Sequence, residues 1–158
     1  MPTKIIAVLA ALLLVAACES KSTDTATNTN NGVVNGTVTK GSQQDFTINV
    51  GDHTFFEYDS YALTPQARDT LTKQAAWLKQ YGTWRVTVEG HCDERGTREY
   101  NLALGERRAS AIRAFLIAQG IPANRVRTIS YGKERPEVLG SDEASYAKNR
   151  RGVTVLSN

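Results

Sequence analysis

One stretch of the chain changes from the hydrophobic period of a strand to that of a helix, and this change constrains the fold most. Residues 84–89 alternate between large apolar and polar side chains, with Trp84, Val86 and Val88 on one face. That is the period of a half-buried strand. From Glu99 onward the apolar residues recur every three or four positions, as on one face of a helix. The stretch therefore predicts a strand, a charged turn and a long helix that packs on the sheet.

A guanidinium beside the apolar stripe of this predicted helix is the first candidate for a functional group. Arg108 borders the stripe near the turn, where it must find an anion. One interpretation is a salt bridge with Asp93, which would close the turn onto the helix. The alternative is that both charges face an open cleft, which would suit a zwitterion because Asp93 can take an ammonium and Arg108 a carboxylate. The stripe consists of Leu102, Gly105, Ala109, Ile112 and Leu116.

The same residues carry a family resemblance. Residues 89–109 read Glu-Gly-His-Cys-Asp-Glu-Arg-Gly-Thr-Arg-Glu-Tyr-Asn-Leu-Ala-Leu-Gly-Glu-Arg-Arg-Ala, and this string resembles the peptidoglycan-associated lipoprotein branch of the OmpA-like C-terminal domain family. The resemblance continues through residues 129–136 and 149–151, so it covers nearly everything after the mid-forties. It implies a domain that binds the peptide stem of peptidoglycan without catalysis, hence no enzyme and no cofactor.

The resemblance also implies roles for single residues. The residue matching Asp93 contacts the free ammonium of meso-diaminopimelate and the residue matching Arg108 its carboxylate, which favours the cleft interpretation. Asn101 and Leu104 are expected to shape the pocket.

Two further segments resemble parts of the family's cleft. Residues 56–61 resemble its Phe-Asp-x-Tyr-like stretch, which adds Tyr58, Asp59 and Tyr61 as candidates, although aromatic residues beside a turn also serve packing alone. Residues 149–151 resemble its Asn-Arg-Arg and add Arg151, for which a solvated basic cluster before a strand is the other interpretation.

The N-terminal region is expected to be a lipoprotein leader and a tether. Residues 1–17 have one basic residue and then an uncharged apolar run that is too short to span a bilayer, as in a signal peptide. The small residues before Cys18 resemble a lipobox, which predicts lipidation of Cys18 and anchoring to a membrane. Glu19 after the cysteine favours the outer membrane, with the domain facing the periplasm. The alternative is a plain secretory signal followed by an incidental cysteine. Residues 18–44 are too polar to form a core and predict a flexible tether.

The rest of the chain, residues 45–158, is long enough for one domain of ordinary size. Strands are predicted at 46–50 and 53–58 as a hairpin, and again at 126–131 and 151–156. Besides the long helix, the pattern predicts a helix over 65–81, capped by Thr64, and a short one over 142–148. The expected fold is a two-layer α/β (α+β) sandwich, with two main helices on one mixed sheet and a parallel strand pair around the long helix.

Other classes of function are weakly supported. His91 and Cys92 are adjacent, and side chains of adjacent strand residues point to opposite faces, so they predict no metal site and no catalytic pair. The formal net charge is +3 with acids interleaved among the bases, which gives no basic stripe for nucleic acid. The remaining alternative is a protein-interaction scaffold. Here the resemblance implies the periplasmic components of the Tol system as partners.

Overall fold

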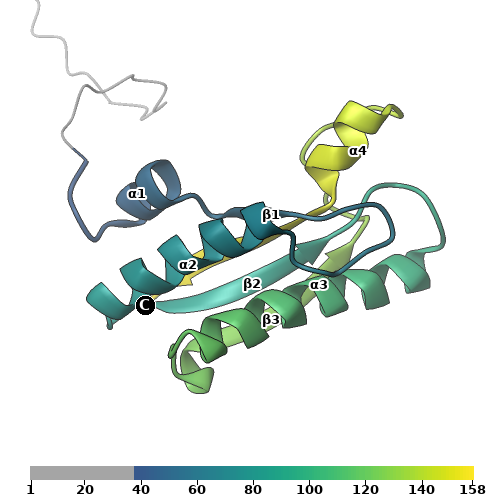
Figure 1. The fold of residues 1–158 in the computed structure, drawn as a ribbon. Helices are drawn as coiled ribbons and strands as arrows, with labels where there is room; N and C mark the ends of the chain where they lie inside the picture. Colours follow the sequence, from purple (N-terminus) through teal and green to yellow (C-terminus); the bar gives the residue numbers. More distant parts are fainter. Residues whose placement is uncertain (1–37) are drawn as a thin grey trace, which may run out of the picture. The chain divides into compact units, whose positions relative to one another are not determined.

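The computed structural model describes residues 38–158, and Figure 1 shows how their helices and strands are arranged. The predicted signal peptide (1–17), Cys18 and most of the predicted tether (18–44) lie outside the described residues. In chain order the elements are α1 (Gln43–Asp45), the π-helix η1 (Phe46–Val50), β1 (His53–Phe55), α2 (Pro65–Gln80), β2 (Arg85–His91), α3 (Arg98–Ala118), the 3-10 helix η2 (Ala123–Arg125), β3 (Val126–Gly132), α4 (Glu143–Asn149) and β4 (Arg151–Ser157).

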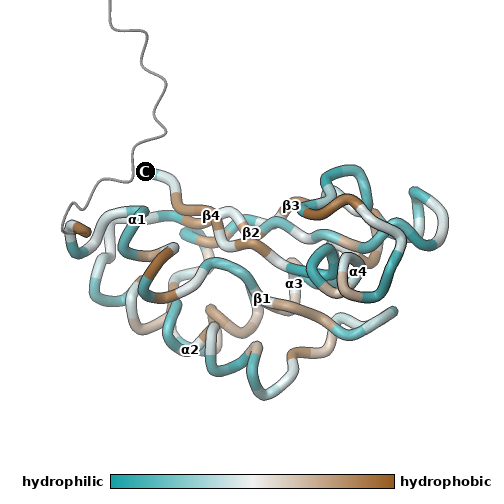
Figure 2. The backbone as a smooth tube through the Cα atoms, turned by 90° about the horizontal axis from the view of Figure 1, so that it is seen from above, coloured by the Kyte–Doolittle hydropathy of each residue, from teal (hydrophilic) through white to brown (hydrophobic). Residues whose placement is uncertain are grey.

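The four strands form one mixed sheet in the order β1-β4-β2-β3. β2 and β3 are parallel and are connected through α3, whereas β4 runs antiparallel to both β1 and β2. The long helices α2 and α3 lie against one side of the sheet, so that the view from above shows one layer of strands and one of helices (Figure 2). This confirms the predicted two-layer fold with its parallel pair. No helix among residues 38–158 is both long and apolar enough to cross a membrane.

The predicted first strand, residues 46–50, is wrong, because this segment is helical. Ser42 caps α1 by accepting a hydrogen bond from the backbone of Asp45. The Asp45 carboxylate in turn accepts hydrogen bonds from the backbone of Gly41 and from the Trp77 indole, each 2.8 Å long. The alternation of apolar residues does not reflect burial on one face, since Phe46 is buried while Ile48 is 61% exposed. Only the short β1 remains of the predicted hairpin.

The predicted cap of α2 is confirmed, and α3 begins after a threonine cap of the same kind. The Thr64 hydroxyl accepts a hydrogen bond from the backbone of Ala67, and Pro65 occupies the first helical position of α2. At the start of α3, Thr97 accepts from the backbone of Tyr100. One member of the predicted stripe is less buried than expected, since Leu102 is 36% exposed. The core between helices and sheet includes Leu71, Leu78, Val86, Val88, Ala109, Ile112 and Leu116.

A pair of glycines brings α3 and β2 into backbone contact. A Cβ atom built on Gly90 would fall on the carbonyl oxygen of Gly105, and one built on Gly105 would meet the Ser130 hydroxyl and the Gly90 carbonyl. The helix can therefore approach the end of the strand as closely as backbone atoms allow. This contact holds the first turns of α3 against the loop that follows β2.

Candidate functional site

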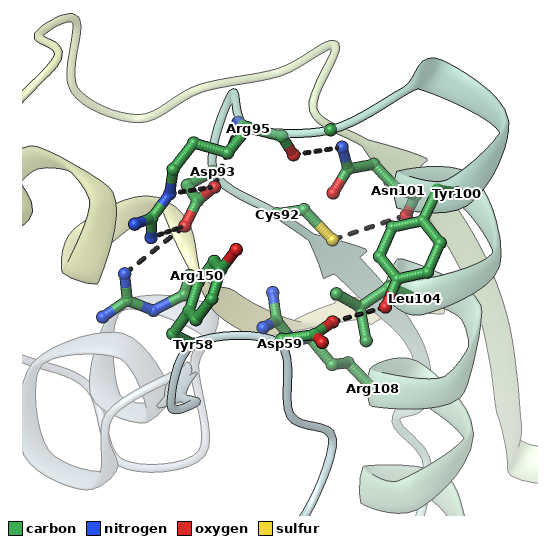
Figure 3. Close-up of a pocket in the computed structure, with 11 residues that line it drawn as sticks. Tyr58, Asp59, Cys92, Asp93, Arg95, Tyr100, Asn101, Leu104, Arg108 and Arg150 are labelled. Atoms are coloured by element: carbon green, nitrogen blue, oxygen red, sulfur yellow. Dashed lines mark hydrogen bonds and ion pairs between the residues drawn. The ribbon is translucent and has the colours of Figure 1, made fainter.

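A pocket with a volume of about 240 Å³ opens where β2 ends and α3 begins (Figure 3). Three parts of the chain that are far apart in sequence line it. They are the loop between β1 and α2, the loop between β2 and α3 with the first turns of α3, and the residue after α4. The lining side chains are Tyr58, Asp59, Cys92, Asp93, Arg95, Tyr100, Asn101, Leu104, Arg108 and Arg150, and the backbone of Gly96 completes the wall.

Arg108 is a fully buried cation in this pocket. Its guanidinium donates to three backbone carbonyl oxygens, those of Ser60 at 2.8 Å, His91 at 2.7 Å and Glu57 at 3.1 Å. Burial lowers the pKa of Arg108 from its usual range. None of the ion pairs within residues 38–158 includes this guanidinium. A guanidinium has five N–H donors, so these three hydrogen bonds leave two N–H groups without a carbonyl acceptor.

Asp93 supplies the buried carboxylate of the pocket, and two arginines hold it. Arg95 binds it with two side-chain nitrogens, Nη2 to Oδ2 at 2.5 Å and Nε to Oδ1 at 3.2 Å. Arg150 Nη1 lies 3.4 Å from Oδ2. Burial alone would raise the pKa of Asp93, but the hydrogen bonds from Arg95 outweigh it, so the pKa lies below its usual value. The salt bridge considered from sequence, between Asp93 and Arg108, is not formed, although both groups line one pocket.

Asp59 and Tyr100 form the opposite rim. The Tyr100 hydroxyl donates a hydrogen bond to the Asp59 carboxylate, which raises the pKa of Tyr100. Asp59 adopts a left-handed backbone conformation with φ of 51°, in which the carboxylate is presented from a tight loop. The ring of Tyr58 lies over the Arg95 guanidinium, with 4.1 Å between the ring centroid and Cζ.

Asn101 and Cys92 fix the floor of the pocket. The Asn101 amide donates to the backbone carbonyls of Arg95 at 2.8 Å and Thr97 at 3.0 Å, which locks the loop onto α3. The Cys92 thiol donates to the Asn101 carbonyl at 3.4 Å and is buried. Burial raises its pKa to about 11, so the thiol stays protonated at neutral pH. Cys92 is thus shielded from solvent.

Comparison with known proteins places this fold and pocket in a family. The OmpA family model matches residues 55–150. The peptidoglycan-associated lipoprotein of Brucella melitensis is 52% identical over 145 residues, which are 92% of this chain and 86% of that protein. The chain belongs to the peptidoglycan-associated lipoproteins of the OmpA family. The Agrobacterium fabrum member is 59% identical over 121 residues, 77% of this chain and 68% of that protein. The crystal structure of the Burkholderia pseudomallei member, 42% identical, covers 67% of this chain and 90% of that one with a TM-score of 0.65.

Most candidates named from the sequence of this OmpA-family member lie together, but two do not. Tyr61 is half exposed and lies beside Arg107, 5.9 Å from ring centroid to Cζ, outside the pocket lining. Arg151 is turned away from the pocket and pairs with Glu137 at 2.7 Å. Arg150 reaches the pocket instead, because adjacent residues at the start of a strand point in opposite directions. Those found together are Tyr58, Asp59, Asp93, Asn101, Leu104 and Arg108.

Sequence reasoning missed three charged or aromatic side chains of the lining. Tyr100 lies one helical turn before Leu104, so helical spacing from that residue could have found it. Arg150 belongs to the basic segment 149–151, from which only Arg151 was predicted to reach the cleft. For Arg95, nothing in the sequence beyond its position in the turn indicates a role in the pocket. Within the described part of the chain, no three His, Cys, Asp or Glu side chains gather where a metal ion could be held.

We expect His91 to make the stability of this OmpA-like domain depend on pH. It is buried against Tyr131, with 5.5 Å between ring centroids, and burial together with the charge of Arg151 lowers its pKa from 6.5 to about 4. The unfolded chain therefore binds a proton below pH 6.5 that the folded domain binds only near pH 4. We expect the free energy of unfolding to fall by up to about 3 kcal/mol as the pH drops from 6.5 to 4.

The variant His91→Phe keeps an aromatic ring on Tyr131 and removes the titrating group. Urea unfolding at a series of pH values between 4 and 7 should show a shallower loss of stability for His91→Phe than for the parent. An unchanged slope would mean that other groups cause the acid sensitivity of the domain.

Proposed function

We propose that the protein is a lipid-anchored outer-membrane protein that binds peptidoglycan non-covalently through the meso-diaminopimelate of the peptide stem. In this way it would link the outer membrane to the cell wall, as part of the Tol-Pal system in envelope integrity and cell division. The observation that carries the proposal is the fully buried Arg108, which lines an open pocket and, within residues 38–158, has carbonyl partners but no carboxylate partner.

A buried charge needs a counter-charge, and for Arg108 a ligand is the natural source. Carbonyl oxygens satisfy part of the guanidinium but do not neutralise it. A carboxylate entering the pocket could form charge-assisted hydrogen bonds with the remaining N–H groups. The lining holds three guanidinium groups and two carboxylates, so it offers partners for both a carboxylate and an ammonium group of one ligand.

The pocket also offers an acidic group to a ligand ammonium. Asp93 is ionised, buried and on the same wall as Arg95 and Arg150. The far end of meso-diaminopimelate carries an ammonium and a carboxylate on one carbon atom. Asp93 would bind the ammonium and Arg108 the carboxylate. The walls of the pocket would be formed by Asn101, Leu104, Tyr58 and Asp59. A stem that has lysine at this position lacks the carboxylate and would leave Arg108 without its counter-charge, which would make the site selective.

The anchoring part of the proposal concerns residues that lie mostly outside the described range. Residues 1–17 would be removed as a signal peptide, Cys18 would carry the lipid, and residues 18–44 would form the tether to the domain at 45–158. The backbone of Gly41 accepts a hydrogen bond from the Trp84 indole, so the tether would be somewhat shorter than the sequence predicts. Tol periplasmic components are proposed as partners from the family resemblance, and a membrane-to-wall link by binding requires no catalysis.

Co-sedimentation with purified peptidoglycan sacculi tests the proposal. The full-length protein in detergent should pellet with sacculi that contain meso-diaminopimelate, and the free amino acid should displace it. Sacculi whose stems carry lysine serve as the control and should retain little protein. If the protein stays in the supernatant with both kinds of sacculi, the proposal is wrong.

Asp93→Asn should remove the attraction for the ligand ammonium with little change of shape. We expect binding to sacculi to weaken about 100-fold or more, because a charge-assisted hydrogen bond inside a pocket contributes roughly 2 to 4 kcal/mol. Sedimentation at several protein concentrations measures the change, and circular dichroism checks that the fold is kept. Binding at the parental level would rule out Asp93 as the ammonium site.

A further inference from the structure

The carboxylate proposed to receive the ligand ammonium is already occupied by the protein itself. Both oxygen atoms of Asp93 accept hydrogen bonds from Arg95, whose backbone N–H adds a third at 3.1 Å, and Oδ2 also lies near Arg150 (Figure 3). A carboxylate offers about four lone-pair directions. An incoming ammonium therefore meets an acceptor with nearly all positions taken, and must replace one of the guanidinium contacts.

Arg95 is the contact that can be exchanged at low cost. Its guanidinium lies against two aromatic rings, with Cζ 4.1 Å from the Tyr58 centroid and 4.3 Å from that of Tyr146. A second carboxylate, Glu143, is within reach, because its Oε2 atom lies 3.6 Å from Arg95 Nη1. The arginine can thus move from Asp93 toward Glu143 while it keeps its cation–π contacts with the rings.

Arg150 is held more firmly and stays with Asp93. It is buried, it donates to the Phe56 carbonyl at 3.1 Å, and its Nη2 atom pairs with Glu143 at 2.7 Å. Its contact would keep Asp93 ionised after Arg95 has moved. By contrast, the Arg95 side chain is about one third exposed, so solvent can reach it as it exchanges partners.

We propose that Arg95 is an internal competitor of the ligand ammonium for Asp93, and that Glu143 accepts its guanidinium when the ligand binds. This inference rests on the proposed function. Arg95 then sets the affinity of the site without being part of the bound contact. In the free protein it neutralises a buried carboxylate that would otherwise have Arg150 as its main counter-charge.

The test is a double-mutant cycle on binding of a soluble stem peptide that ends in meso-diaminopimelate, measured by calorimetry on the full-length protein. Arg95→Gln removes the competitor and should tighten binding about fivefold, the equivalent of about 1 kcal/mol for one exchanged ion pair. Glu143→Gln removes the acceptor and should weaken binding by a similar factor. The double variant should bind as tightly as Arg95→Gln, because the pair between Glu143 and Arg150 is kept in both the free and the bound protein and Glu143 then changes the affinity through Arg95 alone.

Matched controls and outcomes make the test decisive. Arg98→Gln removes an exposed arginine that pairs with Glu134 outside the pocket, and Glu99→Gln removes a neighbouring exposed acid. Both should bind as the parent does. Weaker binding by Arg95→Gln would show that Arg95 holds the ligand itself, and additive effects in the double variant would remove Glu143 from the exchange; either result overturns the inference. If Arg95→Gln binds the peptide and the parent does not, the competition is still supported. If neither the parent nor Arg95→Gln binds, the proposed function is overturned as well.

Discussion

Gly90→Ala is expected to destabilise the domain more than any other single-methyl change. The added Cβ would fall on the carbonyl oxygen of Gly105, and a backbone atom cannot move aside as the end of a flexible side chain can. Either α3 must shift away from β2 or the strand must bend. We expect the free energy of unfolding to fall by about 3 kcal/mol or more, the upper end of the range for overpacking.

Gly82→Ala is the matched control for this effect. A Cβ atom on Gly82 meets nothing within 4 Å, and its backbone does not need a left-handed conformation. Urea unfolding followed by circular dichroism should therefore show a near-parental midpoint for Gly82→Ala and a large shift for Gly90→Ala. Equal midpoints for the two variants would show that the backbone contact contributes little to stability.

Arg108→Ala is expected to have two large effects, on binding and on stability. It removes the proposed partner of the ligand carboxylate, so binding to sacculi should be lost. It also leaves three carbonyl oxygens without their donor, the buried one of His91 and the partly buried ones of Glu57 and Ser60. Each such orphaned group costs roughly 1 to 3 kcal/mol, partly offset where water enters. The domain should thus lose about 3 kcal/mol of stability, and the loop at 57–60 should become more susceptible to proteolysis.

Arg108→Lys separates these two effects. The ammonium keeps the charge, but it cannot donate to three carbonyls and a carboxylate with the geometry of a planar guanidinium. Stability should recover in part, whereas binding measured by co-sedimentation should stay at least about 100-fold weaker than in the parent. Parental binding by Arg108→Lys would mean that a charge anywhere in the pocket suffices, and would contradict recognition of a carboxylate by the guanidinium.

Much of the fold follows from local signals in the sequence. The change of period at residues 84–99 predicts β2, the turn and α3, and the hydroxyl groups of Thr64 and Thr97 mark where the long helices begin. The failure lies at residues 46–50, where alternation of apolar residues favoured a strand. There the deciding contact is the hydrogen bond from Trp77 to Asp45, two residues that lie 32 positions apart, and no local pattern contains it.

The candidate site, too, could be predicted from the sequence only in part. Helical spacing brings Asn101, Leu104 and Arg108 onto one face, so their convergence follows from the period of α3. The partners of Asp93 cannot be found from helical spacing. Arg150 lies 57 residues away in the sequence, and the path of the loop decides where Arg95 points. Arg150 and Arg151 are adjacent, so their side chains point in opposite directions and only one of them can line the pocket. The sequence of the basic triplet does not show which one it is.

The backbone contact between Gly90 and Gly105 has a consequence for how ligands are distinguished. It holds the end of β2 rigidly against α3, and the carboxylate of Asp93 lies on the loop after β2 while the guanidinium of Arg108 lies on α3. The gap between the two charges is then set by main-chain atoms and changes little with side-chain rotamers. In the proposed binding mode, a ligand would be selected by whether the distance between its own charged groups matches that gap, and binding would require little ordering of the protein.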